Sequence, residues 1–223
     1  MRVLEQGKQQ RLVEYLVDLQ KSNDPILTEM EDVAKEKQFP IIGPECGRRL
    51  MTFALAVGAS KVFEMGSGYG YSTLWFARAV GPGGEVVHTD GDPANTESAK
   101  QYLQRAEIID RVRFLTGDAV ALLEDDAGLY DVILIDIDKQ DYPKALAAAV
   151  PKLRVGGFIL AHNVIWHGAV ADPSDTEKST EGIREYNRRA YSHPELVSFT
   201  DPTDDGLGIS LKVDPAVRST LPI

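Results

Sequence analysis

The stretch "KVFEMGSGYGYSTLWFARAV", residues 61–80, decides the fold. It opens with a short apolar run typical of a buried strand, continues through Gly66, Gly68 and Gly70, and ends in a segment with helical spacing. Glycines in such a turn permit positive φ angles, and they let a ligand approach the bare backbone at a helix N-terminus. The stretch therefore predicts a strand, a glycine-rich turn and a helix, the first unit of an α/β sheet.

Similar strand and helix units follow along the chain. Further apolar runs lie at 85–89, 111–115, 131–136 and 157–161, and helical patterns lie at 93–106, 142–153 and 180–191. Nearly continuous apolar strands that alternate with helices indicate a parallel sheet covered on both faces. Two more strands, at 195–200 and 207–213, flank the turn "DPTDDGLG", so the last strand is expected to be antiparallel to its neighbour. We predict a Rossmann-like, doubly wound α/β fold.

The chain is predicted to form a single domain. Its 223 residues suffice for one sizeable core, and no repeat, low-complexity tract or Pro/Gly-rich linker divides it. Residues 1–55 are predicted to be helical and residues 56–223 to form the ligand-binding α/β core, because helical patterns fill the first region and the strands begin after it.

Composition limits the classes of partner. The start, "MRVLEQGKQQ", lacks the apolar core of a signal peptide and no stretch is long and apolar enough to span a membrane, so a cytoplasmic protein is expected. The single cysteine, Cys46, excludes an internal disulfide and any Cys-based zinc cage, and we interpret it as a small helix-packing residue. A net charge of -10 disfavours a partner held mainly through phosphates.

Residues at the ends of the first three predicted strands suggest a nucleoside site. Asp90 lies 24 residues after Gly66, where an acid can accept both ribose hydroxyl protons. Asp118 and Ala119 are expected to face an adenine edge, although Asp118 also suits a helix N-cap. The candidate cofactor contacts are Glu64, Gly66, Ser67, Gly68, Gly70, Ser72, Asp90, Gly117, Asp118 and Ala119.

Two ligand classes fit this site, a nicotinamide dinucleotide and S-adenosylmethionine. The dinucleotide pattern is G-x-G-x-x-G, whereas this chain has E-x-G-x-G-x-G with Glu64 before the turn. A carboxylate there would repel a pyrophosphate but suits the ammonium group of a cationic ligand. S-adenosylmethionine is therefore favoured.

Five motifs together resemble the small metal-dependent O-methyltransferases of the catechol and caffeoyl-coenzyme A group. They are "FPIIGPECGRRL", "FEMGSGYGYS", "YDVILIDIDKQDY", "RVGGFILAHNVIWHG" and "DDGLGISLKV", and they span nearly the whole chain. The resemblance implies a seven-stranded sheet, a homodimer, and methyl transfer to a hydroxyl, commonly on a catechol-like small molecule.

The resemblance also assigns roles within the D-x-D-K-x-x-Y motif. It implies that Asp136 binds a divalent cation, that Asp138 contacts the methionine part of the cofactor, and that Lys139 lies beside the reacting hydroxyl. On chemical grounds Lys139 is then expected to take the hydroxyl proton, because a nearby cation lowers the pKa of its amine. Asp136 is counted with Asp138 among the cofactor contacts. Positions i and i+2 on a strand point to the same side, which agrees with a shared site.

The next strand carries His162 and Asn163 to the same edge of the sheet, so the expected metal ligands are Asp136, His162 and Asn163. Trp166 and Tyr142 are candidate acceptor contacts, with Trp166 on a polar segment expected to be a mobile flap.

His162 is a departure from the family pattern, which usually has Asp-Asn here. Mg²⁺ is the family's cation, and imidazole favours Mn²⁺ or another transition metal instead. A structural role for His162 stays open at this point.

Three functions remain under consideration. The first is a small-molecule catechol-type O-methyltransferase. The second is a tRNA wobble-uridine O-methyltransferase, which would need a basic surface built from Arg48, Arg49, Arg184, Arg188 and Arg189. The third is a non-catalytic nucleoside-binding module that has lost its metal site.

Overall fold

The computed structural model describes residues 6–20 and 22–222 and contains a seven-stranded sheet. The strand order is β3-β2-β1-β4-β5-β7-β6, and β7 is antiparallel to both of its neighbours while the other pairings are parallel. The strands are β1 (Lys61–Met65), β2 (Glu85–Asp90), β3 (Val112–Thr116), β4 (Tyr130–Ile135), β5 (Leu153–His162), β6 (Leu196–Asp201) and β7 (Leu207–Lys212). The predicted fold class is confirmed, including the antiparallel last strand.

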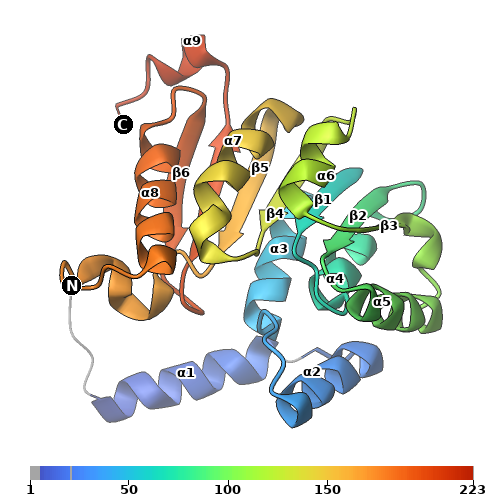
Figure 1. Ribbon diagram of the computed structural model, residues 1–223. Coiled ribbons are helices and arrows are strands. Elements are labelled where there is room, and N and C mark those ends of the chain that lie inside the picture. Colours follow the sequence, from blue (N-terminus) through green and yellow to red (C-terminus); the bar gives the residue numbers. More distant parts are fainter. Residues whose placement is uncertain (1–5, 21, 223) are drawn as a thin grey trace.

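Helices cover both faces of the sheet (Figure 1). On one face lie α2 (Pro25–Lys37), α3 (Pro44–Ala56), α4 (Tyr71–Val80) and α5 (Pro93–Arg105), and on the other lie α6 (Ala119–Asp125), α7 (Tyr142–Lys152) and α8 (Lys178–Ser192). Alternating strand residues point to the two faces, so Val62 joins the first core and Phe63 the second. The chain therefore folds as three layers.

The first helix, α1 (Gln6–Gln20), lies along the lower edge of the molecule in Figure 1, away from the sheet. It exposes Leu12, Tyr15, Leu16 and Leu19. The homodimer implied by the resemblance stays a prediction. Residues 1–5 of the predicted helical region and Ile223 lie outside the described residues. No helix within 6–20 and 22–222 has the length and apolar character to cross a membrane.

Several elements differ from their predicted bounds. Helix α6 was not expected, and β5 begins at Leu153 rather than at residue 157. Short 3₁₀ helices occupy Ile109–Arg111 (η1), Lys139–Asp141 (η2) and Trp166–Ala171 (η3), and a final short helix α9 spans Pro215–Arg218. The ends of β1, β2, β4 and β5 nevertheless point to one edge, which is where the predicted site residues meet.

Candidate active site

A cavity of about 1060 Å³ opens at the carboxyl ends of the parallel strands. This is the position expected for ligands in open α/β sheets. Its walls include most of the predicted site residues, namely Gly66, Ser67, Gly68, Ser72, Asp90, Gly117, Asp118, Ala119, Asp136, Asp138, Lys139, His162, Asn163 and Trp166. The other three predicted site residues do not line the cavity and are buried: Glu64, Gly70 and Tyr142.

The glycine turn brings β1 against the end of β4. Gly66 has φ +81°, and a Cβ placed on it would lie 2.2 Å from the carbonyl oxygen of Asp136. The amide of Asp136 donates to the carbonyl of Met65 at 2.9 Å, so the two strands stay paired at this point. Gly70, with φ +93°, instead packs on α5, since a Cβ there would lie 2.8 Å from that of Ala99. The turn thus joins the cofactor side of the cavity to the strand that carries Asp136.

Asp90 is held in a fixed orientation at the end of β2. One carboxylate oxygen accepts from the Gly68 amide at 2.9 Å, and the other accepts from the Asp92 amide at 2.8 Å and from Asn95 at 3.1 Å. Asp118 caps α6 by accepting from the Ala121 amide at 2.8 Å, and it also lines the cavity. The capping and the cavity-lining interpretations of Asp118 are therefore compatible.

Glu64 is fully buried beneath the glycine turn. Its Oε2 accepts from the Thr73 hydroxyl at 2.5 Å, whereas its Oε1 has no hydrogen-bond partner. Burial raises the pKa of Glu64 to about 7, although the hydroxyls of Ser72, Thr73 and Ser67 act in the opposite direction. A buried carboxylate in this state favours a cationic ligand nearby.

Lys139 lines the cavity, and its Nζ contacts three groups of the motif, one of which is the carbonyl of Ile137 at 3.3 Å. The ammonium donates to Asp136 Oδ1 at 2.9 Å and to the Tyr142 hydroxyl at 3.0 Å. Tyr142 is fully buried, and its hydroxyl lies 2.7 Å from the carbonyl of His162. Tyr142 was predicted to contact the acceptor. Its hydroxyl instead contacts Lys139 from within the core.

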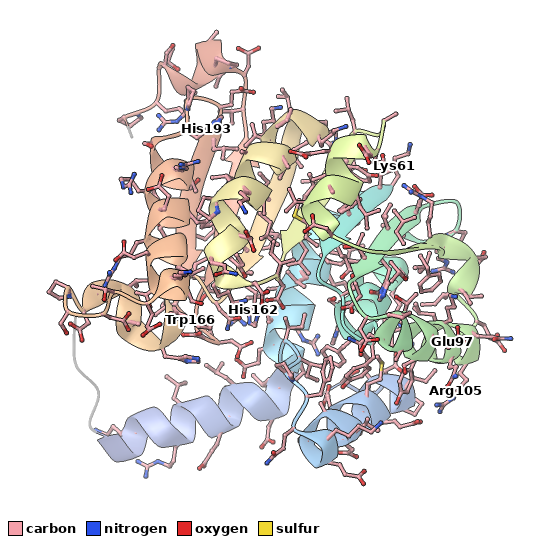
Figure 2. All side chains as sticks on the ribbon, in the orientation of Figure 1. Lys61, Glu97, Arg105, His162, Trp166 and His193 are labelled. Atoms are coloured by element: carbon pink, nitrogen blue, oxygen red, sulfur yellow. The ribbon has the colours of Figure 1, made fainter. Side chains whose placement is uncertain are left out.

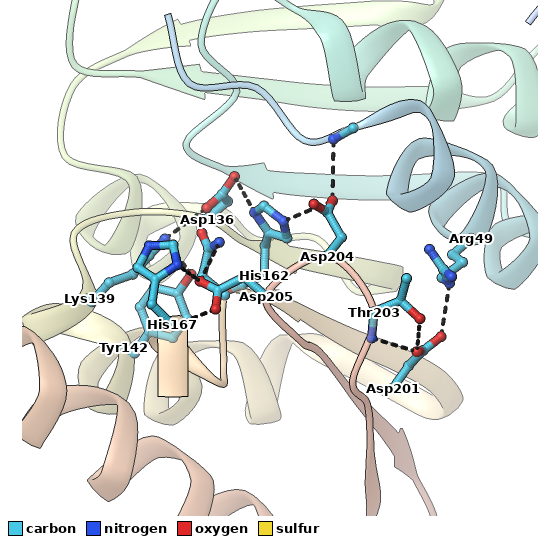
Figure 3. A network of polar contacts seen from close by, with 12 residues as sticks. Arg49, Asp136, Lys139, Tyr142, His162, His167, Asp201, Thr203, Asp204 and Asp205 are labelled. Carbon is cyan, nitrogen blue, oxygen red and sulfur yellow. Dashed lines mark hydrogen bonds and ion pairs between the residues drawn. The ribbon is translucent and has the colours of Figure 1, made fainter. Parts of the chain in front are cut away.

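His162 lies between two carboxylates (Figure 3). Its Nδ1 is 3.4 Å from Asp136 Oδ2 and its Nε2 is 3.5 Å from Asp204 Oδ2. Burial lowers the pKa of His162, but the hydrogen-bonding and Coulombic effects of Asp136 and Asp204 outweigh it and raise the pKa to about 9. The same ion pairs hold the pKa of Asp204 below its ordinary value. Asp204 was not among the predicted site residues.

A pH dependence of stability follows for the metal-free protein. Because the folded-state pKa of His162 lies above its unfolded value, its stabilisation is complete below the unfolded pKa of about 6.5 and is lost as pH rises through about 9. We expect the free energy of unfolding to fall by roughly 3 kcal/mol between about pH 6.5 and 9.5. Urea unfolding in chelator across this range measures the change.

The His162→Gln variant is the control, and it should show a much flatter profile over the same range. Two other buried groups with shifted pKa values affect stability mainly below pH 7. Burial raises the pKa of Glu64 to about 7 and lowers the pKa of His88 to about 4. Equal slopes for wild type and His162→Gln would contradict the assignment.

Trp166 and Asn163 complete the cavity on the side of η3. Figure 2 places Trp166 and His162 at one end of the sheet and His193 at the opposite end. Asn163 lines the cavity and donates through its amide nitrogen to Asp205 Oδ2 at 3.1 Å, a bond that does not use its amide oxygen. Lys139 Nζ lies 5.9 Å from the centre of the Trp166 ring.

The segment after Asn163 was expected to be a mobile flap, but it is tied down by Arg184. The Arg184 guanidinium donates to the carbonyls of Val170 at 3.1 Å, Asp175 at 2.7 Å and Ala169 at 3.0 Å. Four of the arginines considered for a tRNA surface are therefore engaged within the chain: Arg184 here, Arg49 with Asp201, and both Arg188 and Arg189 with Glu185.

The strand order, the glycine turn and the cavity at the strand ends are those of a Rossmann-like methyltransferase. The chain belongs to the O-methyltransferase family, whose model matches residues 18–213. It is 34% identical over 179 residues to a catechol O-methyltransferase of Niastella koreensis, a match that covers 78% of this chain and 81% of that protein.

Two solved structures share the fold. The O-methyltransferase of Bacillus cereus, solved in complex with SAH, is 28% identical, with a TM-score of 0.82 and coverage of 89% and 96% of the two chains. An O-methyltransferase of Streptomyces achromogenes, solved in complex with SAM, is 25% identical, with a TM-score of 0.84 and coverage of 95% and 100%. A non-catalytic module is thus not favoured.

Proposed function

We propose that this O-methyltransferase moves the methyl group of S-adenosylmethionine to a hydroxyl of a catechol-like small molecule, with help from a divalent cation. The observation that carries the proposal is the group of Asp136, Lys139 and His162 beside the glycine turn, in one cavity with the nucleoside residues. The relatives named as catechol and SAM-bound O-methyltransferases support the same acceptor and cofactor.

The cofactor would lie across the carboxyl ends of β1 to β4. Asp90, fixed by the Gly68 amide, is positioned to accept from ribose hydroxyls, and Ala119 lies at the start of α6 where an adenine edge can be contacted. Glu64 is buried under the turn with its pKa raised to about 7, and a cationic methionine end nearby would favour its ionised form, whereas a pyrophosphate would not. Asp138, exposed at the cavity, would bind the ammonium group.

Lys139 is proposed to act on the acceptor. A neutral amine at this position would keep its hydrogen bonds to Asp136 and Tyr142 and present its lone pair to the reacting hydroxyl. After the proton moves to Nζ, the Asp136 carboxylate at 2.9 Å stabilises the ammonium. Trp166 lines the same end of the cavity and would pack on the acceptor ring.

The side chains around His162 fit a divalent cation. The carboxylates of Asp136 and Asp204 face the two ring nitrogens of His162 at 3.4 and 3.5 Å, neither nitrogen has a satisfactory hydrogen bond, and Asn163 lines the same cavity. These residues would hold the ion at His162. A bound cation would supply Lewis acidity that lowers the pKa of the acceptor hydroxyl.

The acceptor class can be tested with labelled S-adenosylmethionine and a set of phenols. Catechol presents two adjacent hydroxyls to one ion, whereas resorcinol does not, so we expect transfer to catechol to exceed transfer to resorcinol by at least about tenfold. Equal rates with both phenols would contradict chelation. Transfer to bulk tRNA in place of phenols would identify the second function, which the internally paired arginines disfavour.

His162 is expected to set the metal preference. Imidazole is a borderline donor that suits Mn²⁺, Co²⁺ or Zn²⁺ and does little for Mg²⁺. The ratio of turnover with Mn²⁺ to turnover with Mg²⁺ should therefore fall by roughly tenfold in His162→Asp. Metal-free enzyme assayed with each ion measures this ratio.

His167→Asp makes the same chemical change on an exposed histidine of the same cavity, and it should leave the ratio unchanged. A magnesium preference in the wild type, or an equal ratio in His162→Asp, would overturn this assignment of His162.

A further inference from the structure

Three side chains from distant parts of the chain meet beside the cavity. The thiol of Cys46, a ring nitrogen of His162 and a carboxylate oxygen of Asp204 lie within 4.8 Å of one another. They come from the first turn of α3, the last residue of β5 and the turn between β6 and β7. Among the described residues, no other group of three His, Cys, Asp or Glu side chains meets this distance.

The two ring nitrogens of His162 face different partners. Nδ1 faces Asp136 at 3.4 Å and Nε2 faces Asp204 at 3.5 Å, and both are buried without a geometrically satisfactory hydrogen bond. A neutral imidazole has one N–H and one lone pair. With its N–H toward Asp136, a neutral His162 presents the lone pair of Nε2 toward Asp204, where either a proton or a metal ion supplies the positive charge that both groups attract.

The distances suit a tetrahedral ion on the Nε2 side. Zinc bonds of about 2.0–2.3 Å to nitrogen, oxygen and sulfur place neighbouring donors roughly 3.3–3.8 Å apart. The Nε2 to Asp204 separation of 3.5 Å lies within that range, and the thiol lies within 4.8 Å of a ring nitrogen of His162 and of the Asp204 carboxylate. Asp204 is also held toward α3 by the amide of Gly43 at 3.4 Å.

We infer that Cys46, His162 Nε2 and Asp204 form a transition-metal site, with Asp136 orienting His162 through Nδ1 and the fourth position open to the cavity. Metal-bound histidines usually donate their second nitrogen to a carboxylate, and Asp136 fills that place. Three protein ligands and one open position are typical of catalytic zinc sites. The inference rests on the proposed cation assistance and specifies which side of His162 holds the ion.

Metal binding here must displace two protons, one from the thiol and one from Nε2 of His162, which is protonated between the two carboxylates in the metal-free protein. Burial, followed by the nearby Asp204 and Asp136 carboxylates, raises the pKa of the Cys46 thiol well above its ordinary value. The S–H bond breaks as the metal–sulfur bond forms, and the proton leaves to solvent. The resulting thiolate lies in the first turn of α3, where the helix dipole favours negative charge.

Cobalt(II) is the probe, because a cobalt–thiolate bond gives an intense near-ultraviolet charge-transfer band. Cys46 is the single cysteine of the chain, so such a band reports this site and no other. We expect the band on adding Co²⁺ to the metal-free wild-type protein at neutral pH, and we expect Zn²⁺ to remove it by competition. This readout needs neither turnover nor a variant.

Substitutions then distinguish the proposed metal ligands, Cys46 and Asp204, from Asp136, the carboxylate proposed to orient His162. Cys46→Ser should bind Co²⁺ without the band, Asp204→Asn should weaken Co²⁺ binding at least about tenfold, and Asp136→Asn should keep the band with affinity reduced roughly 10- to 100-fold. Asp201→Asn, at the last residue of β6 and paired with Arg49, is the matched control and should keep wild-type cobalt affinity.

Two results would overturn the inference, and they differ in what else they affect. Cobalt binding by wild type without the thiolate band places the ion on the Nδ1 side, with Asp136 and Asn163, and leaves the proposed function intact. Failure of Co²⁺ and Zn²⁺ to bind, together with full turnover in chelator, removes both this site and the proposed cation assistance.

Discussion

Replacing Lys139 by methionine should lower turnover of an established acceptor by roughly 10²- to 10⁴-fold, the range for loss of a general acid–base group. Methionine keeps the apolar stem but has no amine to take the acceptor proton, and Nζ is the group that joins Asp136 to Tyr142. Affinity for S-adenosylhomocysteine should stay within about twofold of wild type, because Lys139 acts on the acceptor and not on the nucleoside. Steady-state kinetics and calorimetry give the two quantities.

Lys35→Met is the matched control for this prediction. Lys35 is also paired with an acid three residues away, Asp32 at 3.5 Å, but both side chains are exposed and neither lines the cavity. Its loss should change neither turnover nor cofactor affinity. Unchanged turnover in Lys139→Met would remove Lys139 from the reaction.

Gly66→Ala should abolish cofactor binding and destabilise the fold, because no space exists for the added methyl group. The new Cβ would lie 2.2 Å from the Asp136 carbonyl oxygen, a backbone atom that cannot rotate away. The ends of β1 and β4 would have to separate, which displaces both the glycine turn and Asp136. We expect a loss of at least about 3 kcal/mol in the free energy of unfolding, with no measurable binding of S-adenosylhomocysteine.

Gly83→Ala is the control that separates the effect of the steric clash at Gly66 from the effect of backbone strain. Gly83 has φ +83°, nearly the same as Gly66, but no atom lies within 4 Å of its added Cβ. It should cost only about 1–2 kcal/mol, the strain of a left-handed alanine, and leave cofactor affinity unchanged. If both variants showed the same stability and bound the cofactor normally, the close approach of Gly66 to Asp136 would not be needed for stability or for cofactor binding.

The sheet could be predicted from the sequence because local patterns encode it. Apolar strands at "KVFEM" and "DVILID" are short, continuous and followed by glycine or charge, and the structure has β1 and β4 at these places. Helix α6 was missed because its seven residues are too few for a clear helical period. The early start of β5 was missed because "RVGG" lacks a continuous apolar pattern.

The cavity residues were also largely predictable, since parallel strands deliver their carboxyl ends to one edge. Asp136, Lys139 and His162 lie together as expected. Asp204 was hidden because it lies in a polar turn, 42 residues after His162, where an acid is ordinarily a solvated loop residue. Cys46 looked like a packing residue because helical spacing does not show that α3 begins beside the site.

Tyr142 illustrates a different limit. The motif spacing placed it at the site, but spacing does not say whether a side chain faces the cavity or the core. Its ring is fully buried against Tyr186, at 5.4 Å between ring centres, and its hydroxyl contacts Lys139 instead of lining the cavity. Arg184 was likewise a surface arginine in the sequence, yet it fixes the segment that carries Trp166.

The most direct measurement is the initial rate of methyl transfer from labelled S-adenosylmethionine to catechol by the metal-free protein, with chelator and then with Mn²⁺ or Co²⁺ restored. We expect negligible transfer in chelator and recovery with either ion, because in the proposed function a cation at His162 activates the hydroxyl and Lys139 deprotonates it. Full transfer in chelator, or no transfer to catechol under any condition, would contradict the proposed function.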